Sequence, residues 1–171
     1  NTNSVNAANA FGAITIEAGE LTIVEVEPDF DKVREDKENV VLGGFNLTNV
    51  AGQNLELQEF GVRIDFDAGI TGFTAATQFL TEVELYNEET GSSYELTTVD
   101  TDLDAVFSEN SVDVIIPQGT TSWSIRADTA ETINNFDTAS FVLSFTTGNI
   151  STTTGWFYVE ETEDDTAVTD I

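Results

Sequence analysis

The chain of 171 residues contains no cysteine, no histidine and no methionine. Without imidazole and thiol groups it cannot build Ser-His-Asp or Cys-His catalytic units, metal sites with His or Cys ligands, or disulfide bonds. Positive charge is almost as scarce, with 5 Lys and Arg against 32 Asp and Glu and a formal net charge of -27. Because nucleic acids and anionic lipids are bound largely through cationic groups, this balance excludes nucleic acid as a partner and disfavours an acidic membrane surface.

Long apolar runs are also missing. No stretch approaches the roughly 20 apolar residues that a membrane-spanning helix needs, so we expect no membrane insertion. The hydrophobic content of 40%, with 12 Phe, is nevertheless typical of a folded domain rather than of a disordered chain. The sequence starts at Asn1 without a basic and apolar leader, and we expect a secreted, extracellular protein from which an upstream signal peptide has been removed.

Short apolar runs separated by Gly, Asn, Asp, Ser and Thr predict the fold class. Apolar residues recur mostly at two-residue intervals in Leu21–Glu27 and in Leu55–Phe66, which is the period of a strand with one face in a core. Helical spacing is nearly absent. We therefore predict an all-β antiparallel β-sandwich, jelly-roll or immunoglobulin-like, of about ten short strands with few or no helices. The other expected strands are Gly12–Glu17, Val40–Thr48, Phe79–Tyr86, Ser93–Val99, Ala105–Phe107, Val112–Pro117, Thr121–Ala127, Ser140–Thr146 and Trp156–Glu160.

The two ends differ from the middle and divide the chain. Residues 1–16 form a mostly polar arm, residues 17–160 form the sandwich domain, and residues 161–171 form an acidic tail or strand. Either end can pair outside its own domain. An open sandwich edge has unpaired backbone groups, and a strand from a neighbouring copy satisfies them by β-augmentation.

A consensus of strand patterning and turn residues runs through the middle of the chain, over roughly residues 40–150. Its segments are Val41–Asn49, Leu55–Val62, Leu80–Gly91, Val106–Phe107, Val112–Thr121 and Ile125–Thr129. This pattern resembles the β-sandwich modules of S-layer-like or adhesin-like surface proteins of candidate-phyla bacteria. The resemblance implies a structural role outside the cell.

A second resemblance lies nearer the N-terminus, in Asn9–Phe11, Glu17–Ile23 and Phe45–Gly52. These segments are similar to matrix-fibre subunits of the TasA and camelysin type, which are secreted sandwiches that polymerise by lending an N-terminal strand to a neighbour. The resemblance implies a homopolymer of neighbouring copies.

In that homopolymer the arm of residues 1–16 would be the donated strand. Its apolar residues Phe11, Ile14 and Ile16 would then be the assembly residues.

Carboxylates at alternate positions are the candidate metal ligands. Asp100, Asp102 and Asp104 form such a run, which suits hard, oxygen-ligated Ca²⁺. The run is not an EF-hand, because Ala105 stands where Gly is needed and Ser111 where Glu is needed. Further acidic pairs and runs at expected strand ends are Asp29 with Asp31, Asp65 with Asp67, and Glu163–Asp165.

The excess of acid leaves two explanations open. Bound Ca²⁺ would relieve the mutual repulsion of the carboxylates, and such sites respond at low divalent concentration. Alternatively the acids are solvated, as in a protein adapted to salt, and stability then rises smoothly with any salt.

Two tripeptides, Asn46-Leu47-Thr48 and Asn149-Ile150-Ser151, match the N-glycosylation pattern, so Asn46 and Asn149 are candidate glycosylation sites.

The aromatic residues near the C-terminal half support either of two interpretations. Trp123, Trp156, Phe157 and Tyr158 can form a sugar-stacking platform, but we expect them in the core. Trp123 alternates with polar residues, as an inward-facing strand position does. Arg63 and Arg126 are isolated cations on expected strands, and we expect each to pair with a nearby acid.

The sequence therefore predicts a structural subunit of an extracellular filament or surface layer, which assembles by strand exchange with Ca²⁺ support. The alternative is a secreted module that binds carbohydrate, such as cell-surface glycans, or another surface. Two carboxylates suffice for glycoside hydrolysis, but nothing singles out a pair among 32 acids, and we expect no enzyme activity.

Overall fold

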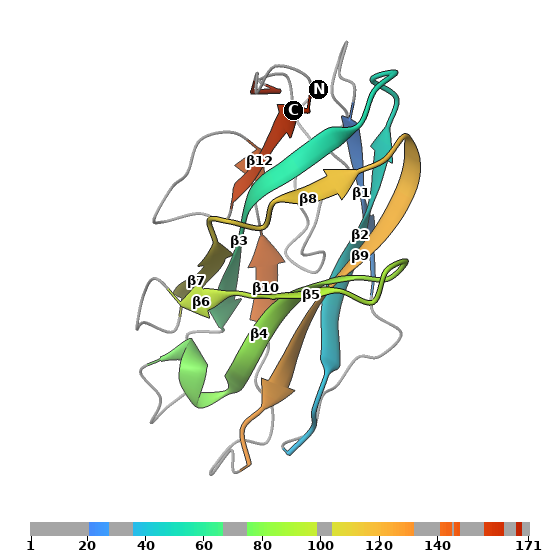
Figure 1. Ribbon diagram of the computed structural model, residues 1–171. Helices are drawn as coiled ribbons and strands as arrows, with labels where there is room; N and C mark the ends of the chain where they lie inside the picture. Colours follow the sequence, from blue (N-terminus) through green and yellow to red (C-terminus); the bar gives the residue numbers. More distant parts are fainter. Residues whose placement is uncertain are drawn as a thin grey trace.

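The computed structural model describes residues 21–27, 36–66, 75–98, 104–131, 141–144, 146–147, 156–162 and 167–168. These residues form two β-sheets that pack face to face (Figure 1). Apart from one single-turn 3-10 helix, Ala76–Gln78, the regular elements of the described residues are all strands. The predicted all-β antiparallel sandwich is therefore confirmed.

Five strands form the first sheet, called sheet A, in the order β1-β2-β9-β4-β5. Their bounds are Leu21–Val26 for β1, Val40–Asn49 for β2, Gly119–Thr129 for β9, Leu80–Asn87 for β4 and Ser93–Glu95 for β5. Every neighbouring pair in this sheet is antiparallel. The sheet therefore joins segments from both halves of the described chain.

The second sheet, called sheet B, is organised around β3, a long strand at Leu55–Phe66. Both edges of β3 are shared by two shorter strands placed end to end. On one edge, β8 pairs with the first residues of β3 and β7 pairs with its later residues. On the other edge, β12 pairs with the first part of β3 and β10 pairs with its end. The bounds are Thr97–Thr98 for β6, Asp104–Glu109 for β7, Val114–Ile116 for β8, Phe141–Ser144 for β10, Thr146–Thr147 for β11 and Trp156–Glu161 for β12.

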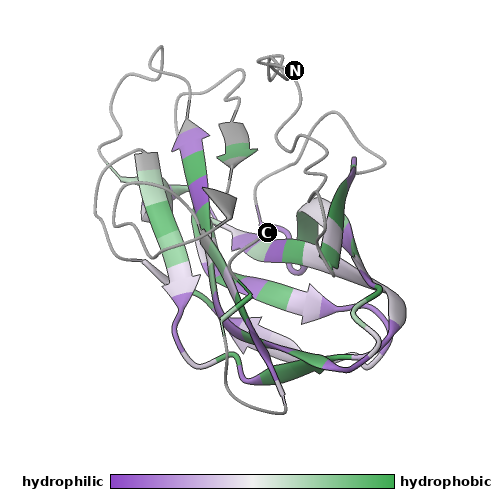
Figure 2. Ribbon diagram, turned by 90° about the horizontal axis from the view of Figure 1, so that it is seen from above, coloured by the Kyte–Doolittle hydropathy of each residue, from purple (hydrophilic) through white to green (hydrophobic). Residues whose placement is uncertain are grey.

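The core lies between the sheets and is built from alternate residues of each strand (Figure 2). Three fully buried rings connect the layers: Phe45 comes from sheet A, and Phe60 and Phe157 come from sheet B. The Phe45 and Phe60 rings stack with centroids 5.7 Å apart, and Phe157 meets both edge-on at 6.3 Å. Such offset and edge-to-face contacts are the favoured arrangements of aromatic pairs.

The strands expected from the sequence agree with the observed ones, with two differences. The expected strand Ser93–Val99 is divided at Leu96, because β5 pairs in sheet A while β6 pairs in sheet B. Leu96 is buried at this corner, and its N–H donates to the carbonyl of Val83. The expected strand Ser140–Thr146 is likewise divided into β10 and β11. The expected strand Gly12–Glu17 lies outside the described residues.

Part of the predicted C-terminal tail folds back on the sandwich. Ala167 forms an antiparallel bridge with Glu160, and the Val168 N–H donates to the carbonyl of Val159. Val168 also packs against the core. These residues of the tail therefore contact their own domain.

Candidate functional site

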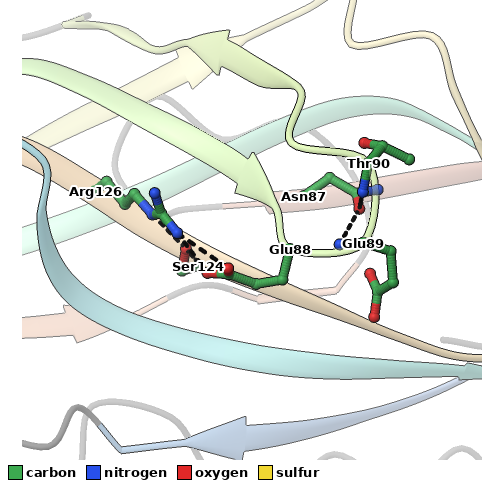
Figure 3. Close-up of polar contacts among 6 residues, drawn as sticks. All are labelled: Asn87, Glu88, Glu89, Thr90, Ser124 and Arg126. Atoms are coloured by element: carbon green, nitrogen blue, oxygen red, sulfur yellow. Dashed lines mark hydrogen bonds and ion pairs between the residues drawn. The ribbon is translucent and has the colours of Figure 1, made fainter.

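The most elaborate polar cluster among the described residues lies on the outer face of sheet A, around Arg126 of β9 (Figure 3). Its Nη2 donates to Glu88 Oε1 at 2.9 Å and to Oε2 at 3.0 Å, and its Nε donates to Ser124 Oγ at 3.0 Å. Ser124 Oγ in turn donates to Glu88 Oε1 at 2.5 Å. The guanidinium carbon lies 3.4 Å from the centre of the Tyr86 ring. We call Tyr86, Glu88, Ser124 and Arg126 the arginine latch.

The turn between β4 and β5 positions Glu88. Asn87 is buried, and its side-chain oxygen accepts hydrogen bonds from the N–H groups of Glu89 and Thr90. Gly91 follows with a φ of +74°, a left-handed conformation that glycine adopts without steric cost. This Asn and Gly chemistry is typical of a tight turn.

The same turn is fastened to β9 through Ser122. The Glu88 N–H donates to the Ser122 carbonyl at 3.0 Å, and the Ser122 N–H donates to Glu89 Oε1 at 2.7 Å. The Glu89 carboxylate therefore replaces a missing strand partner at the end of the ladder.

Electrostatics keep Glu88 ionised. Partial burial tends to raise its pKa, but the hydrogen bonds from Ser124 and Arg126, together with the charge of Arg126, outweigh burial and lower the pKa. A carboxylate with a lowered pKa is a weak base. The arginine latch is therefore suited to holding the β4–β5 turn on β9 rather than to transferring protons.

Sequence reasoning anticipated only part of this cluster. It expected Arg63 and Arg126 to pair with nearby acids, and both pairs are confirmed: Arg63 with Asp65 at 2.5 Å and Arg126 with Glu88. Glu88 and Ser124 were missed. The turn sequence after Asn87 carried a signal, because it predicts a hairpin that brings acids next to the neighbouring strand.

Two of the predicted metal ligands come from separate motifs and meet in sheet B. Asp65 in β3 and Asp104 in β7 are direct cross-strand partners. One carboxylate oxygen of Asp65 already accepts from Arg63 Nε. The register therefore joins the Asp65 and Asp100–Asp104 motifs at one end of the sheet.

The other predicted ligands, Asp29, Asp31, Asp67, Asp100 and Asp102, lie outside the described residues, as does the run Glu163–Asp165. Within the part of the chain that is described, no group of three or more acidic side chains is arranged to hold a metal ion. The Ca²⁺ site stays a prediction.

The aromatic residues divide between core and surface. Trp123 and Phe157 are buried in the core, as expected, and for Trp123 the alternation with polar residues was the signal. The expectation that Tyr158 is a core residue is wrong, because it lies between the buried residues Phe157 and Val159 and is only partly buried. The position of Trp156 is opposite Gly61 in the register.

Tyr158 is surrounded by acids on the outer face of sheet B. Its hydroxyl donates to Glu160 Oε1 at 2.7 Å, and Glu59 is its direct partner on β3. The hydrogen bond to Glu160 is the main cause that raises the pKa of Tyr158, and partial burial and the charges of Glu160 and Glu59 act in the same direction. The phenol is therefore held as a neutral donor.

The remaining predicted sites are placed as follows. Asn46 lies in β2, partly exposed, on the outer face of sheet A. Asn149 and the assembly residues Phe11, Ile14 and Ile16 lie outside the described residues.

No protein-family model, curated protein or solved structure matches the chain. The resemblances to S-layer-like or adhesin-like modules and to TasA and camelysin-type subunits therefore stay predictions. The described residues contain no helix of the length and apolar character that crossing a membrane requires.

Proposed function

We propose that this protein is a structural subunit of an extracellular filament or surface layer, and that it self-assembles by β-strand exchange. One observation carries the proposal. Of the strands described at the outside of the two sheets, β1 is the longest, with 6 residues, whereas β5, β6, β8, β10 and β11 have between 2 and 4. Short edge strands protect a sheet against pairing with other chains, whereas a longer edge offers a template for an added strand.

The sequence places the arm of residues 1–16 directly before β1. A strand donated by a neighbouring copy would add to the β1 edge through main-chain hydrogen bonds and place alternate apolar residues against the end of the core. Ile14 and Ile16 stand at such alternate positions of the arm, and Phe11 adds an aromatic side chain. The absence of cysteine is compatible with a secreted protein whose assembly is independent of redox state.

Calcium is the cation we propose as the support for assembly. The pairing of Asp65 with Asp104 supports it, because two acidic motifs distant in the sequence contribute to one sheet end. Oxygen ligands from carboxylates are those that Ca²⁺ prefers. An Asp104→Asn variant should lose the stabilisation that low Ca²⁺ gives the native chain, whereas Asp113→Asn, at an exposed position in the β7–β8 loop, should keep it.

The absence of cysteine permits a direct test of strand exchange. Two single-cysteine chains, Thr15→Cys and Val24→Cys, would be mixed and oxidised, because any disulfide must join the introduced residues. Thr15 lies between Ile14 and Ile16 and therefore has the outward phase that Val24 has on β1. We expect a disulfide-linked heterodimer within the polymer. Neighbouring positions on β1, Thr22 and Val26, extend the scan to other registers.

A doubly substituted chain serves as the comparison. If Thr15→Cys and Val24→Cys in one chain form only an intramolecular disulfide, the arm pairs with its own β1 and strand exchange is refuted. Failure to cross-link at every β1 position would refute it as well.

A surface- or carbohydrate-binding module is the second candidate function, and Tyr158 is the observation that favours it. A partly exposed ring beside Glu59 and Glu160 combines a stacking surface with hydrogen-bond acceptors, as sugar sites require. Saturable binding of a neutral oligosaccharide that Tyr158→Ala abolishes would support this module. Unchanged binding in the variant, or none in the native chain, would exclude Tyr158 as its site.

A further inference from the structure

Three consecutive register rows on the outer face of sheet A, over β1, β2 and β9, contain no charged residue, and the latch residues Arg126 and Glu88 border these rows at Ser124. Outward positions of these strands align in rows, because the register pairs each β1 residue with β2 and each β2 residue with β9 (Figure 1). The three rows are Thr22, Thr48 and Thr120; Val24, Asn46 and Ser122; and Val26, Gly44 and Ser124. We call these residues the neutral face.

The neutral face contrasts with the rest of the surface. The register of sheet B places Glu56 opposite Glu160, so like charges lie side by side there. Thirty-two of 171 residues are acidic, yet acids are absent from three consecutive rows on three adjacent strands. A surface of this size without charge sets this part of the molecule apart.

Exposed apolar side chains are concentrated in the same region. The described residues expose four large apolar side chains: Val24 at 43%, Val26 at 44%, Val50 at 67% and Ile115 at 45%. Val24 and Val26 belong to the neutral face, and Val50 directly follows the end of β2. Clustered apolar exposure on a polar surface is typical of an interaction site, whereas scattered single residues are not.

We propose that the neutral face is the surface through which two copies of this chain pack against each other. The inference deepens the proposed self-assembly and rests on it. Two molecules that each carry a charge of -27 repel at most orientations, and over β1 and β2 this face lets them meet without opposing carboxylates. The carboxylates of Glu88 and Glu89 lie at its β9 border, where they accept hydrogen bonds from Ser124 and Ser122. A two-fold axis presents the same face to itself, and hydroxyl groups suit that symmetry because each can both donate and accept.

The contents of the face favour a second copy over a sugar. Sugar sites depend on exposed aromatic rings, and the neutral face has none. Tyr86 at its border is covered by Arg126, whose guanidinium carbon lies 3.4 Å from the ring centre. Gly44 lies between Val26 and Ser124 and adds no side chain to the face.

The size of the face predicts how strong this contact is. Three strands spaced about 4.8 Å apart and five residues long cover on the order of 200–250 Å². A stable isolated dimer needs about 800 Å² per partner. The contact is therefore weak alone and becomes effective between filaments, where many copies are repeated and avidity accumulates.

The test adds one charge to the face in the full-length chain. Val24→Glu and Asn46→Asp place a carboxylate in β1 and in β2, and Ile115→Glu and Asn54→Asp are matched controls at exposed positions outside the face. Self-association would be followed by sedimentation velocity at rising salt, and lateral bundling by negative-stain microscopy. Because salt screens the repulsion, native association should strengthen with salt.

We expect both face variants to weaken association more than about tenfold and the controls to match the native chain. Mixing Val24→Glu with Val24→Lys should restore association that neither variant shows alone. An effect of Val24→Glu without one of Asn46→Asp would place the contact at the β1 edge and overturn the proposal.

The remaining outcomes separate this inference from the proposed function. Filaments that bundle normally despite both face substitutions would overturn the neutral face and leave strand exchange standing. A native chain that forms no oligomer at any salt would overturn both. A monomeric chain that binds a soluble neutral β-glucan through Val24 and Asn46 would replace the second copy with a glycan.

Discussion

The three-ring cluster that joins the sheets makes a quantitative prediction about stability. Phe45 is fully buried, with 0% of its surface exposed, and it contacts Phe60 and Phe157 across the sandwich. Truncation of such a ring removes its burial free energy and leaves a cavity, which costs about 3–5 kcal/mol. For a domain of this size each kcal/mol lowers the melting temperature by roughly 2–4 °C, so Phe45→Ala should lower it by about 6–20 °C.

The assay is thermal and urea unfolding followed by circular dichroism, with Val24→Ala as the control. Val24 lies in the same sheet but is 43% exposed, so its truncation should change the stability by no more than about 0.5 kcal/mol. Phe60→Ala alone and combined with Phe45→Ala completes a double-mutant cycle. The coupling should be about 0.5–1.5 kcal/mol in favour of the pair. Equal losses for Phe45→Ala and Val24→Ala would refute the assignment of this cluster as the inter-sheet core.

Three further predictions concern the backbone and the arginine latch. Gly44→Ala should lower the free energy of unfolding in urea by about 1–3 kcal/mol, because a Cβ atom there would lie 2.8 Å from the Trp123 carbonyl oxygen. Unchanged stability would contradict that close approach. Glu82 has a φ of +50° at an exposed position. Glu82→Gly should therefore remove about 1–2 kcal/mol of backbone strain and lose about 0.5–1 kcal/mol to chain entropy, so that the melting temperature rises slightly. A lowered melting temperature would argue against the left-handed conformation. The lowered pKa of Glu88 means that its stabilisation is present above the ordinary value of 4.5 and is lost as the pH falls through the lowered value. Glu88→Gln should therefore be less stable than the native chain at neutral pH, by up to about 1 kcal/mol, because both partners of the ion pair are partly solvated. The difference in unfolding free energy should disappear in acid, and a difference that persists at low pH would argue against the ion pair.

Alternation along single strands was enough to predict the fold class and most strand positions. The bounds expected for Leu55–Phe66 are those observed, because its inward residues are apolar over the whole length. The phase of the alternation at β12 was the harder question. Phe157 and Val159 face the core, so Tyr158 must face outward, but an aromatic run by itself does not indicate which residues occupy the inner positions.

Contacts between distant segments were beyond local patterns. The pairing of Asp65 with Asp104 depends on the register between β3 and β7. The bulge in the pairing of β12 with β3 falls at Gln58, where the apolar alternation of β3 changes phase between Leu57 and Phe60, but the sequence does not indicate which strand pairs there. Leu96 lies in an apparently continuous apolar and polar run, yet the chain changes sheets there. These features follow from how the two layers close over one core.

The neutral face illustrates the same limit at the level of function. Each of its strands shows only ordinary polar and apolar alternation, with Thr, Ser, Asn and Val at outward positions. The absence of charge becomes visible only after β1, β2 and β9 are placed side by side, since β9 is separated from β2 by much of the chain.

Self-assembly is the central claim, and microscopy of the purified full-length chain tests it most directly. Negatively stained samples would be compared after addition of Ca²⁺ and after addition of a chelator, at matched ionic strength. We predict ordered filaments or sheets with Ca²⁺ and their loss with chelator. A monodisperse monomer under both conditions would contradict the structural role.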